Sequence, residues 1–176
     1  VFNNTDDFVI TKGKRSAPSQ FIFATEDGTI SGWNANVDLT HAIRKVDNAN
    51  VMSGPVYKGL ALGRNRDGNF LFATNFRFGV VDVFDAKFTK VASFTDPALA
   101  NDCPILTPVK QCFAPFGIQN IQGKIFVTFA LQNATHHDDV AGPGNGFVDI
   151  FDTNGNLLQR FASGGTLNSP WGLALA

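Results

Sequence analysis

The densest group of side chains able to do chemistry is the run His136, His137, Asp138 and Asp139. Imidazole and carboxylate together suit a divalent transition metal, whereas carboxylates joined by further side-chain oxygens suit calcium. Adjacent residues of an extended segment point in opposite directions, so these four can face one ion only across a sharp turn. The alternative is a solvated loop, in which Gly142-Pro143-Gly144 only turns the chain back.

We expect one rim of the fold to carry this run together with polar residues from equivalent places of an internal repeat. The ligand-binding residues expected there are Glu26, Asp27, Asn75, Arg77, His136 and His137. The expected metal ligands are Asp138, Asp139 and Asn120, and a calcium ion shared between repeats would draw on Glu26, Asn75, Asn120 and Asp138. Turn formation alone also accounts for Asp27-Gly28 and for Asn75, so ligand binding would be added to a structural role.

The repeat that places these residues is clearest in 56–94, where short runs rich in Val, Phe and Leu are bounded by Gly, Asp or Asn. Such runs predict strands of an antiparallel meander. They occupy 57–62, 69–74, 79–85 and 88–94, and return in the same order at 115–120, 123–128, 146–152 and 156–161. A less complete copy includes the hairpin at 21–34, a further copy starts at 169, and 12–19 reads as a polar linker.

A spacing of about 50 residues, with four strands in each period, predicts the blades of a β-propeller. We therefore expect one all-β domain over 1–176, with units at about 1–52, 56–94 and 113–161 and the start of another at 169. About three four-stranded blades leave two exposed edges, which template pairing with other strands. We expect part of a longer six-bladed ring; the alternative is a homodimer in which two copies complete the ring.

The register of the repeat also predicts the core. We expect burial between blades for the equivalent side chains Phe84, Phe151 and Trp33, and for Phe72 and Phe126. Trp171 matches Phe116 of the preceding repeat and is expected in the core by the same argument.

Three stretches, at 21–34, 138–152 and 167–175, resemble a family of largely uncharacterised proteins built of NHL-like repeats. The resemblance covers nearly the whole chain. It implies a six-bladed propeller that is often exported, and it implies no reaction and no catalytic residue. Members are longer, so this chain resembles the middle portion of one.

Composition and charge bear on partners and compartment. The formal net charge is -1, with Lys and Arg spread along the chain, which gives no electrostatic case for nucleic acid. No apolar run is long enough to span a bilayer. Cys103 and Cys112 are expected to form a disulfide, and Asn3 and Asn133 begin glycosylation sequons. Together these features predict a secreted protein; the alternative is a cytosolic one with two free thiols.

Two classes of function remain. The first is a secreted binding or interaction protein without catalysis, whose ligand is a small molecule, a carbohydrate or a protein. The second is a calcium-dependent hydrolase or lactonase, in which a channel metal polarises an ester carbonyl and activates water. In either class we expect the insertion 132–145 to carry specificity, because the matching connection of the second unit is only 75–78.

The cysteine pairing gives a first prediction. Alkylation of the denatured, unreduced protein should label neither Cys103 nor Cys112, because both sulfurs are held in one short-loop disulfide. Mass spectrometry after reduction and a second alkylation provides the control. Labelling of both residues before reduction would contradict the pairing.

Overall fold

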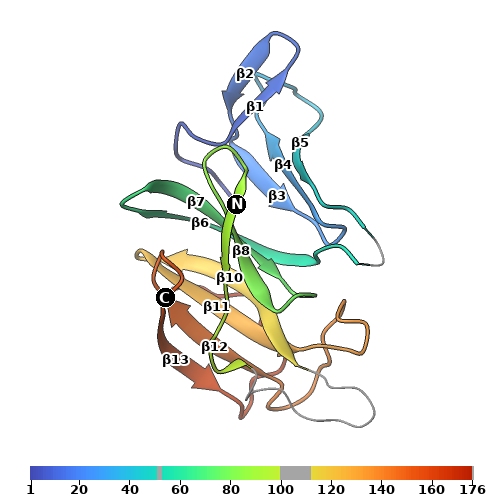
Figure 1. Cartoon of the computed structure of the whole chain (residues 1–176), viewed down its shortest axis with the longest axis vertical. Helices are drawn as coiled ribbons and strands as arrows, with labels where there is room; N and C mark the ends of the chain where they lie inside the picture. Colours follow the sequence, from blue (N-terminus) through green and yellow to red (C-terminus); the bar gives the residue numbers. More distant parts are fainter. Residues whose placement is uncertain (51–52, 100–111, 176) are drawn as a thin grey trace.

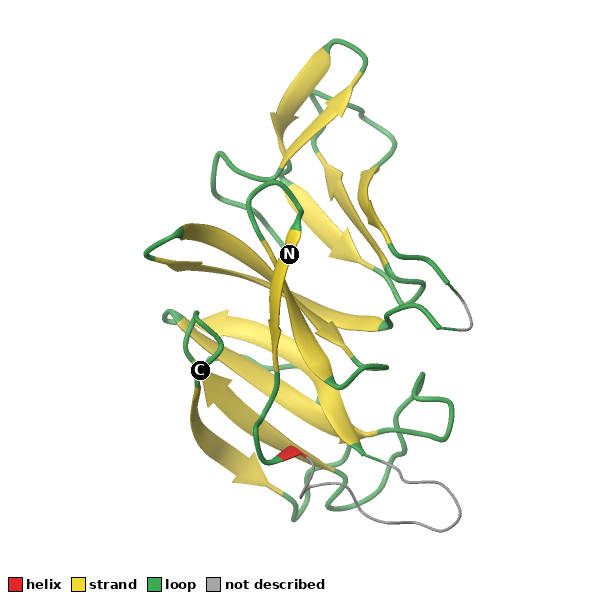
Figure 2. Cartoon of the chain, in the orientation of Figure 1, coloured by secondary structure: helices red, strands yellow, loops and turns green. Residues whose placement is uncertain are grey.

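The computed structural model describes residues 1–50, 53–99 and 112–175, and within these ranges the chain is all-β, with no α-helix and only a short 3₁₀ turn at Leu99 (Figure 2). Short alternating runs separated by Gly, Asn and Asp turns produce the strands. The strands are β1 (Val9–Lys12), β2 (Arg15–Pro18), β3 (Phe21–Ala24), β4 (Thr29–Trp33), β5 (Ile43–Asp47), β6 (Tyr57–Asn65), β7 (Gly68–Asn75), β8 (Val80–Phe84), β9 (Lys90–Phe94), β10 (Phe113–Ile121), β11 (Lys124–Leu131), β12 (Gly146–Phe151) and β13 (Leu157–Ser163).

These strands form four antiparallel sheets, each a meander in sequence order: β1-β2, β3-β4-β5, β6-β7-β8-β9 and β10-β11-β12-β13. Figure 1 shows the three larger sheets following one another along the long axis, with the β1-β2 hairpin at one end. The start of the chain adds a short row to the first of them. Phe2 bridges Phe21, and the Ile22 backbone N–H donates to the Val1 carbonyl at 2.9 Å. Each larger sheet therefore has four rows.

The sheet β6–β9 is buried on both faces along β7 and β8, whereas its last strand, β9, is mostly exposed. Leu71 and Ala73 of β7 pack in one hydrophobic cluster with Ile22 and Ile30 of the first sheet, whereas Phe72 packs in a second cluster with residues of β11 and β12. Successive residues of a strand point to opposite faces, which explains this division. The three sheets are thus stacked face to face, with β6–β9 in the middle.

The first strands of neighbouring sheets approach each other closely at glycine residues. A Cβ atom on Gly59 of β6 would lie 3.0 Å from the carbonyl oxygen of Phe116 in β10. A Cβ atom on Gly117 of β10 would lie 1.9 Å from the carbonyl oxygen of Trp171 in the C-terminal segment. Gly59 and Gly117 occupy equivalent positions of the repeat, and so do Phe116 and Trp171. The same close contact between one repeat and the next, the glycine junction, therefore occurs twice.

The all-β class, the two complete meanders and the hairpin at 21–34 are confirmed. The polar linker expected over 12–19 is wrong, because Arg15–Pro18 forms β2 and pairs with β1. The strand expected to start at Ser169 is not formed within the described residues, although Trp171 lies against β10. The described residues form no closed ring of sheets.

The predicted core is right for Phe72, Phe84 and Phe151, which are at most 1% exposed. It is wrong for Phe126 and Trp33, which are half-buried because they lie on the outward faces of the end sheets. The Phe126 ring packs against that of Phe161, which is 61% exposed. Trp171 is 54% exposed and is also not a core residue.

The glycine junction gives a second prediction. Gly117→Ala should lower the free energy of unfolding by about 1–3 kcal/mol, because its methyl group has no room beside the backbone of Trp171. Gly172→Ala is the matched control, since nothing lies within 4 Å of its added methyl group. Urea unfolding midpoints of the two variants measure the difference. Equal midpoints would show that the junction needs no glycine.

Candidate functional site

Lys58 of β6 is the centre of a polar cluster at one rim of the stacked sheets. Its Nζ atom donates to Glu26 Oε1 at 2.6 Å and lies 3.7 Å from Asp138 Oδ1. The Lys58 side chain is only 5% exposed, against 45% for Glu26 and 63% for Asp138. Glu26 belongs to the β3–β4 turn and Asp138 to the β11–β12 loop, so three sheets meet here. We call Glu26, Lys58, His137 and Asp138 the rim cluster.

Aromatic rings border the rim cluster on its inner side. Lys58 Nζ lies 5.8 Å from the ring centre of Phe76 and 6.0 Å from that of Phe116. The Trp171 ring packs on Phe116 with a 4.6 Å separation between ring centres, and its indole N–H donates to the Lys58 carbonyl at 3.2 Å. The ring quadrupole attracts an ammonium group, so these rings stabilise a charged lysine that has little water around it.

Turn chemistry orients Glu26. Its neighbour Asp27 accepts hydrogen bonds from the Thr25 hydroxyl and, at 3.2 Å, from the Thr29 backbone N–H, while Gly28 has a φ of 89°. The Thr25 hydrogen bond lowers the pKa of the Asp27 carboxyl. Asp27 therefore closes the turn and lies outside the rim cluster, so its role as a ligand stays a prediction, while the adjacent Glu26 is directed at Lys58.

The insertion 132–145 is ordered by Asn133, whose Oδ1 accepts from the backbone N–H groups of Thr135 and His137 at 3.1 and 3.2 Å. This Asx turn brings His137 Nδ1 to 2.9 Å from Asp138 Oδ1. The hydrogen bond from His137 lowers the pKa of the Asp138 carboxyl. A sharp turn is thus present, as the sequence required, and it brings His137 and Asp138 close to Glu26. Asp139 does not join them, and its backbone forms an antiparallel β-bridge with Gln132.

The other predicted rim residues lie apart from the rim cluster. His136 and Arg77 line a separate hollow of about 600 Å³ beside Asp96 and Phe113. Asn75 is 1% exposed, and its Nδ2 atom donates to Asp82 Oδ2 at 3.0 Å, so it supports the fold from inside.

Asn120 lies at the far end of β10 from the β11–β12 loop. Its Nδ2 atom donates to the Leu62 carbonyl at 2.8 Å, and its Oδ1 atom accepts from the Gly123 N–H at 2.9 Å. The expected calcium set is therefore not assembled, because only Glu26 and Asp138 of its four members meet.

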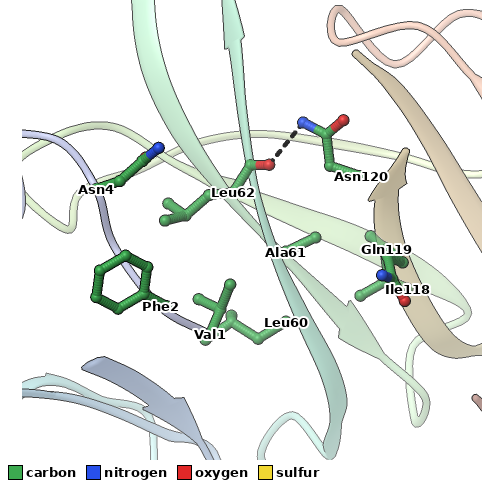
Figure 3. A pocket seen from close by; sticks show the side chains of 9 residues that line it. All are labelled: Val1, Phe2, Asn4, Leu60, Ala61, Leu62, Ile118, Gln119 and Asn120. Carbon is green, nitrogen blue, oxygen red and sulfur yellow. Dashed lines mark hydrogen bonds between the residues drawn. The ribbon is translucent and has the colours of Figure 1, made fainter. Parts of the chain in front are cut away.

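A groove follows the first strands of the sheets away from Lys58. A hollow of about 270 Å³ between Lys58 and Phe23 adjoins, through Val1 and Leu60, a second hollow of about 470 Å³. Figure 3 shows the side chains that line the second hollow: Val1, Phe2, Asn4, Leu60, Ala61, Leu62, Ile118, Gln119 and Asn120. The groove thus connects the rim cluster with Asn120 along β6 and β10.

Sequence reasoning missed Lys58 and a pair of buried aspartates. The signal that could have indicated it is a lysine within the apolar first strand of the central repeat. Asp82 of β8 and Asp149 of β12 are equivalent in the repeat and at most 1% exposed, and each is paired with a cation of the next strand, Lys90 or Arg160. Burial raises the pKa of Asp149 to about 6.

Two predicted modifications have different outcomes. Asn3 is 5% exposed, and its Nδ2 atom donates to the Ser19 carbonyl at 2.9 Å, so this nitrogen is not accessible to glycosylation in the folded chain. Asn133 is partly exposed at the surface and stays a predicted site.

Cys103 lies outside the described residues, so its pairing with Cys112 stays a prediction. Among the described residues, no helix is long and apolar enough to cross a membrane.

Similarity to known proteins was found in one virus. No family model matches the chain. Protein R640 of Acanthamoeba polyphaga mimivirus is 33% identical over 167 residues, which is 94% of this chain and 30% of the viral protein. Proteins R648 and L690 of the same virus are 27% and 29% identical over 98% and 94% of this chain, and each match covers 42% of the viral protein. All three are uncharacterised. The chain spans less than half the length of these curated relatives.

The buried aspartate gives a third prediction. The raised folded-state pKa means that Asp149 favours folding below its ordinary pKa of 3.8 and loses this contribution as the pH rises to about 6. Asp149→Asn cannot ionise, so its free energy of unfolding relative to the wild type should increase from pH 4 to pH 7. Urea unfolding across this range measures the change.

Asp27→Asn serves as the control for this titration. The pKa of Asp27 is lowered, so its contribution changes only below pH 4 and the difference from the wild type should stay flat between pH 4 and pH 7. A flat difference for Asp149→Asn as well would show that burial does not raise the pKa of Asp149.

Proposed function

We propose that the chain forms blades of an exported β-propeller, of the NHL-like kind that its sequence resembles, and that the rim cluster binds a hydroxyl-rich small ligand without catalysis. The observation that carries this proposal is the convergence of three sheets on Lys58, beside the exposed indole of Trp171. A carbohydrate is the ligand class that fits this surface best.

Sheet stacking supports the propeller. Three four-row sheets pack face to face, and the close glycine approach of β6 to β10 is repeated where β10 meets the C-terminal segment. The outward face of the first sheet exposes Phe2, Phe21 and Phe23 by 42 to 62%. A further sheet stacked in the same way would cover these rings, and we propose that it comes from a longer polypeptide, in keeping with the greater length of the viral relatives.

The chemistry of the rim supports a carbohydrate. Glu26 and Asp138 offer exposed carboxylate oxygens that accept hydrogen bonds from hydroxyl groups. The Trp171 ring offers a flat apolar surface for the C–H face of a sugar, and the Phe116 ring and the Lys58 backbone hold it in place. Few precisely placed polar groups around an apolar surface are typical of small-molecule sites.

A calcium-dependent hydrolase receives less support. Such an enzyme needs several oxygen ligands on one ion, and Asn75 and Asn120 direct their amides elsewhere.

Export is supported by the expected disulfide and by the partly exposed sequon at Asn133.

Tryptophan fluorescence tests the proposal. In the Trp33→Phe variant, Trp171 is the only indole, so emission reports on the rim alone. Titration with neutral oligosaccharides of glucose, mannose, galactose and N-acetylglucosamine should reveal one that changes this emission. Asp138→Asn should weaken its binding about tenfold, the effect of losing about 1.4 kcal/mol of hydrogen bonding to a charged acceptor.

Asp139→Asn is the matched control. It makes the same chemical change one residue away, at a carboxylate that does not join the rim cluster, so binding should stay within twofold of the parent. Equal losses in both variants, or an emission that no sugar of the panel alters, would overturn the proposal.

A further inference from the structure

We propose that the Lys58 ammonium group takes the place of a divalent metal ion in the rim cluster, so that Glu26, His137 and Asp138 form a metal site that an internal cation already fills. This inference does not depend on the identity of the ligand proposed above. It assigns the cluster a resident cation and explains how three ligand-type side chains assemble around it.

The donor set is that of a transition-metal site. One ligand atom each from Glu26, His137 and Asp138 lie within 4.8 Å of one another, so a small closing movement would bring all three to one ion. Two carboxylates and an imidazole suit zinc, cobalt and related ions. The three side chains come from two separate connections of the chain, the β3–β4 turn and the β11–β12 loop, and both connections are held by their own turn hydrogen bonds.

Lys58 contributes the positive charge that this donor set requires. Its Nζ atom contacts Glu26 at 2.6 Å and Asp138 at 3.7 Å and lies within about 6 Å of the ring centres of Phe76 and Phe116, and its side chain is 5% exposed. An ammonium group is a compact point charge with three donors, which can bridge carboxylates as a small cation does. Because its covalent attachment keeps it at the site, a free ion has to displace it in order to bind.

Cobalt titration tests the inference, because Co²⁺ binds such sites and reports its ligands by visible absorption. Untagged Lys58→Met, which keeps a flexible apolar stem but removes the charge, should bind one equivalent of Co²⁺ at least tenfold more tightly than the wild type. Its thermal midpoint should rise with Co²⁺, since an ion that binds only the folded state stabilises it. Lys58→Arg keeps the charge and should resemble the wild type.

Two further variants locate the gained site. Asp138→Asn or His137→Ala in the Lys58→Met background should return Co²⁺ affinity to the wild-type level, whereas Asp139→Asn in that background should not. Lys58→Gln, with a polar stem, provides the same comparison should the methionine variant fold poorly.

The wild type gives an independent result. Stoichiometric Co²⁺ binding by the wild type, with affinity equal to that of Lys58→Met or with His137 NMR signals shifted at one equivalent, would overturn the inference. A folded charge-removing variant that gains no affinity would overturn it as well.

Discussion

Two-sided burial of the sheet β6–β9 is the constraint on which the rest of the structure depends. The alternation along β7 sends Leu71 and Ala73 to one face and Phe72 to the other, and each face requires another sheet to cover it. Burial of a large apolar side chain contributes about 1.5–3 kcal/mol, so neither cover is dispensable. Because the sheets are stacked in this way, the β3–β4, β7–β8 and β11–β12 connections lie at the same rim.

The residues of the rim cluster are held in position by turn hydrogen bonds and strand packing that belong to the fold itself. Glu26 is placed by the Asp27 turn, Asp138 by the Asn133 turn, and Lys58 by its position beside Gly59 in a strand that packs on β10. Because each member is held separately, the polar groups meet without the entropy cost of ordering loose loops. In general, a pre-organised surface needs fewer contacts to reach a given affinity than one that has to be ordered on binding.

Local patterns in the sequence predicted much of the fold. The site was predicted less well, because the side chains that contact its residues are distant in the sequence. Alternating apolar runs and Asp-Gly turns located the strands of the two complete meanders, because strand period and turn chemistry are short-range properties. Asn75 and Asn120 were expected in one ligand set because a carboxamide that bonds within the fold and a ligand look alike in sequence until its partners, Asp82 and Leu62, are known. Lys58 was missed for the same reason, since its partners lie 32 and 80 positions away, at Glu26 and Asp138.

The glycine junction has an evolutionary consequence. Gly59 and Gly117 make the same close approach to the next repeat, so each of these two junctions is formed by residues of the two repeats that meet there. Duplication of one repeat copies the junction with it, and the new sheet meets its neighbours with complementary faces from the start. A gene of this design would change length in whole repeats, while substitutions at the exposed positions of a connection, such as Ala134 and Thr135, would leave the packing between the sheets in place.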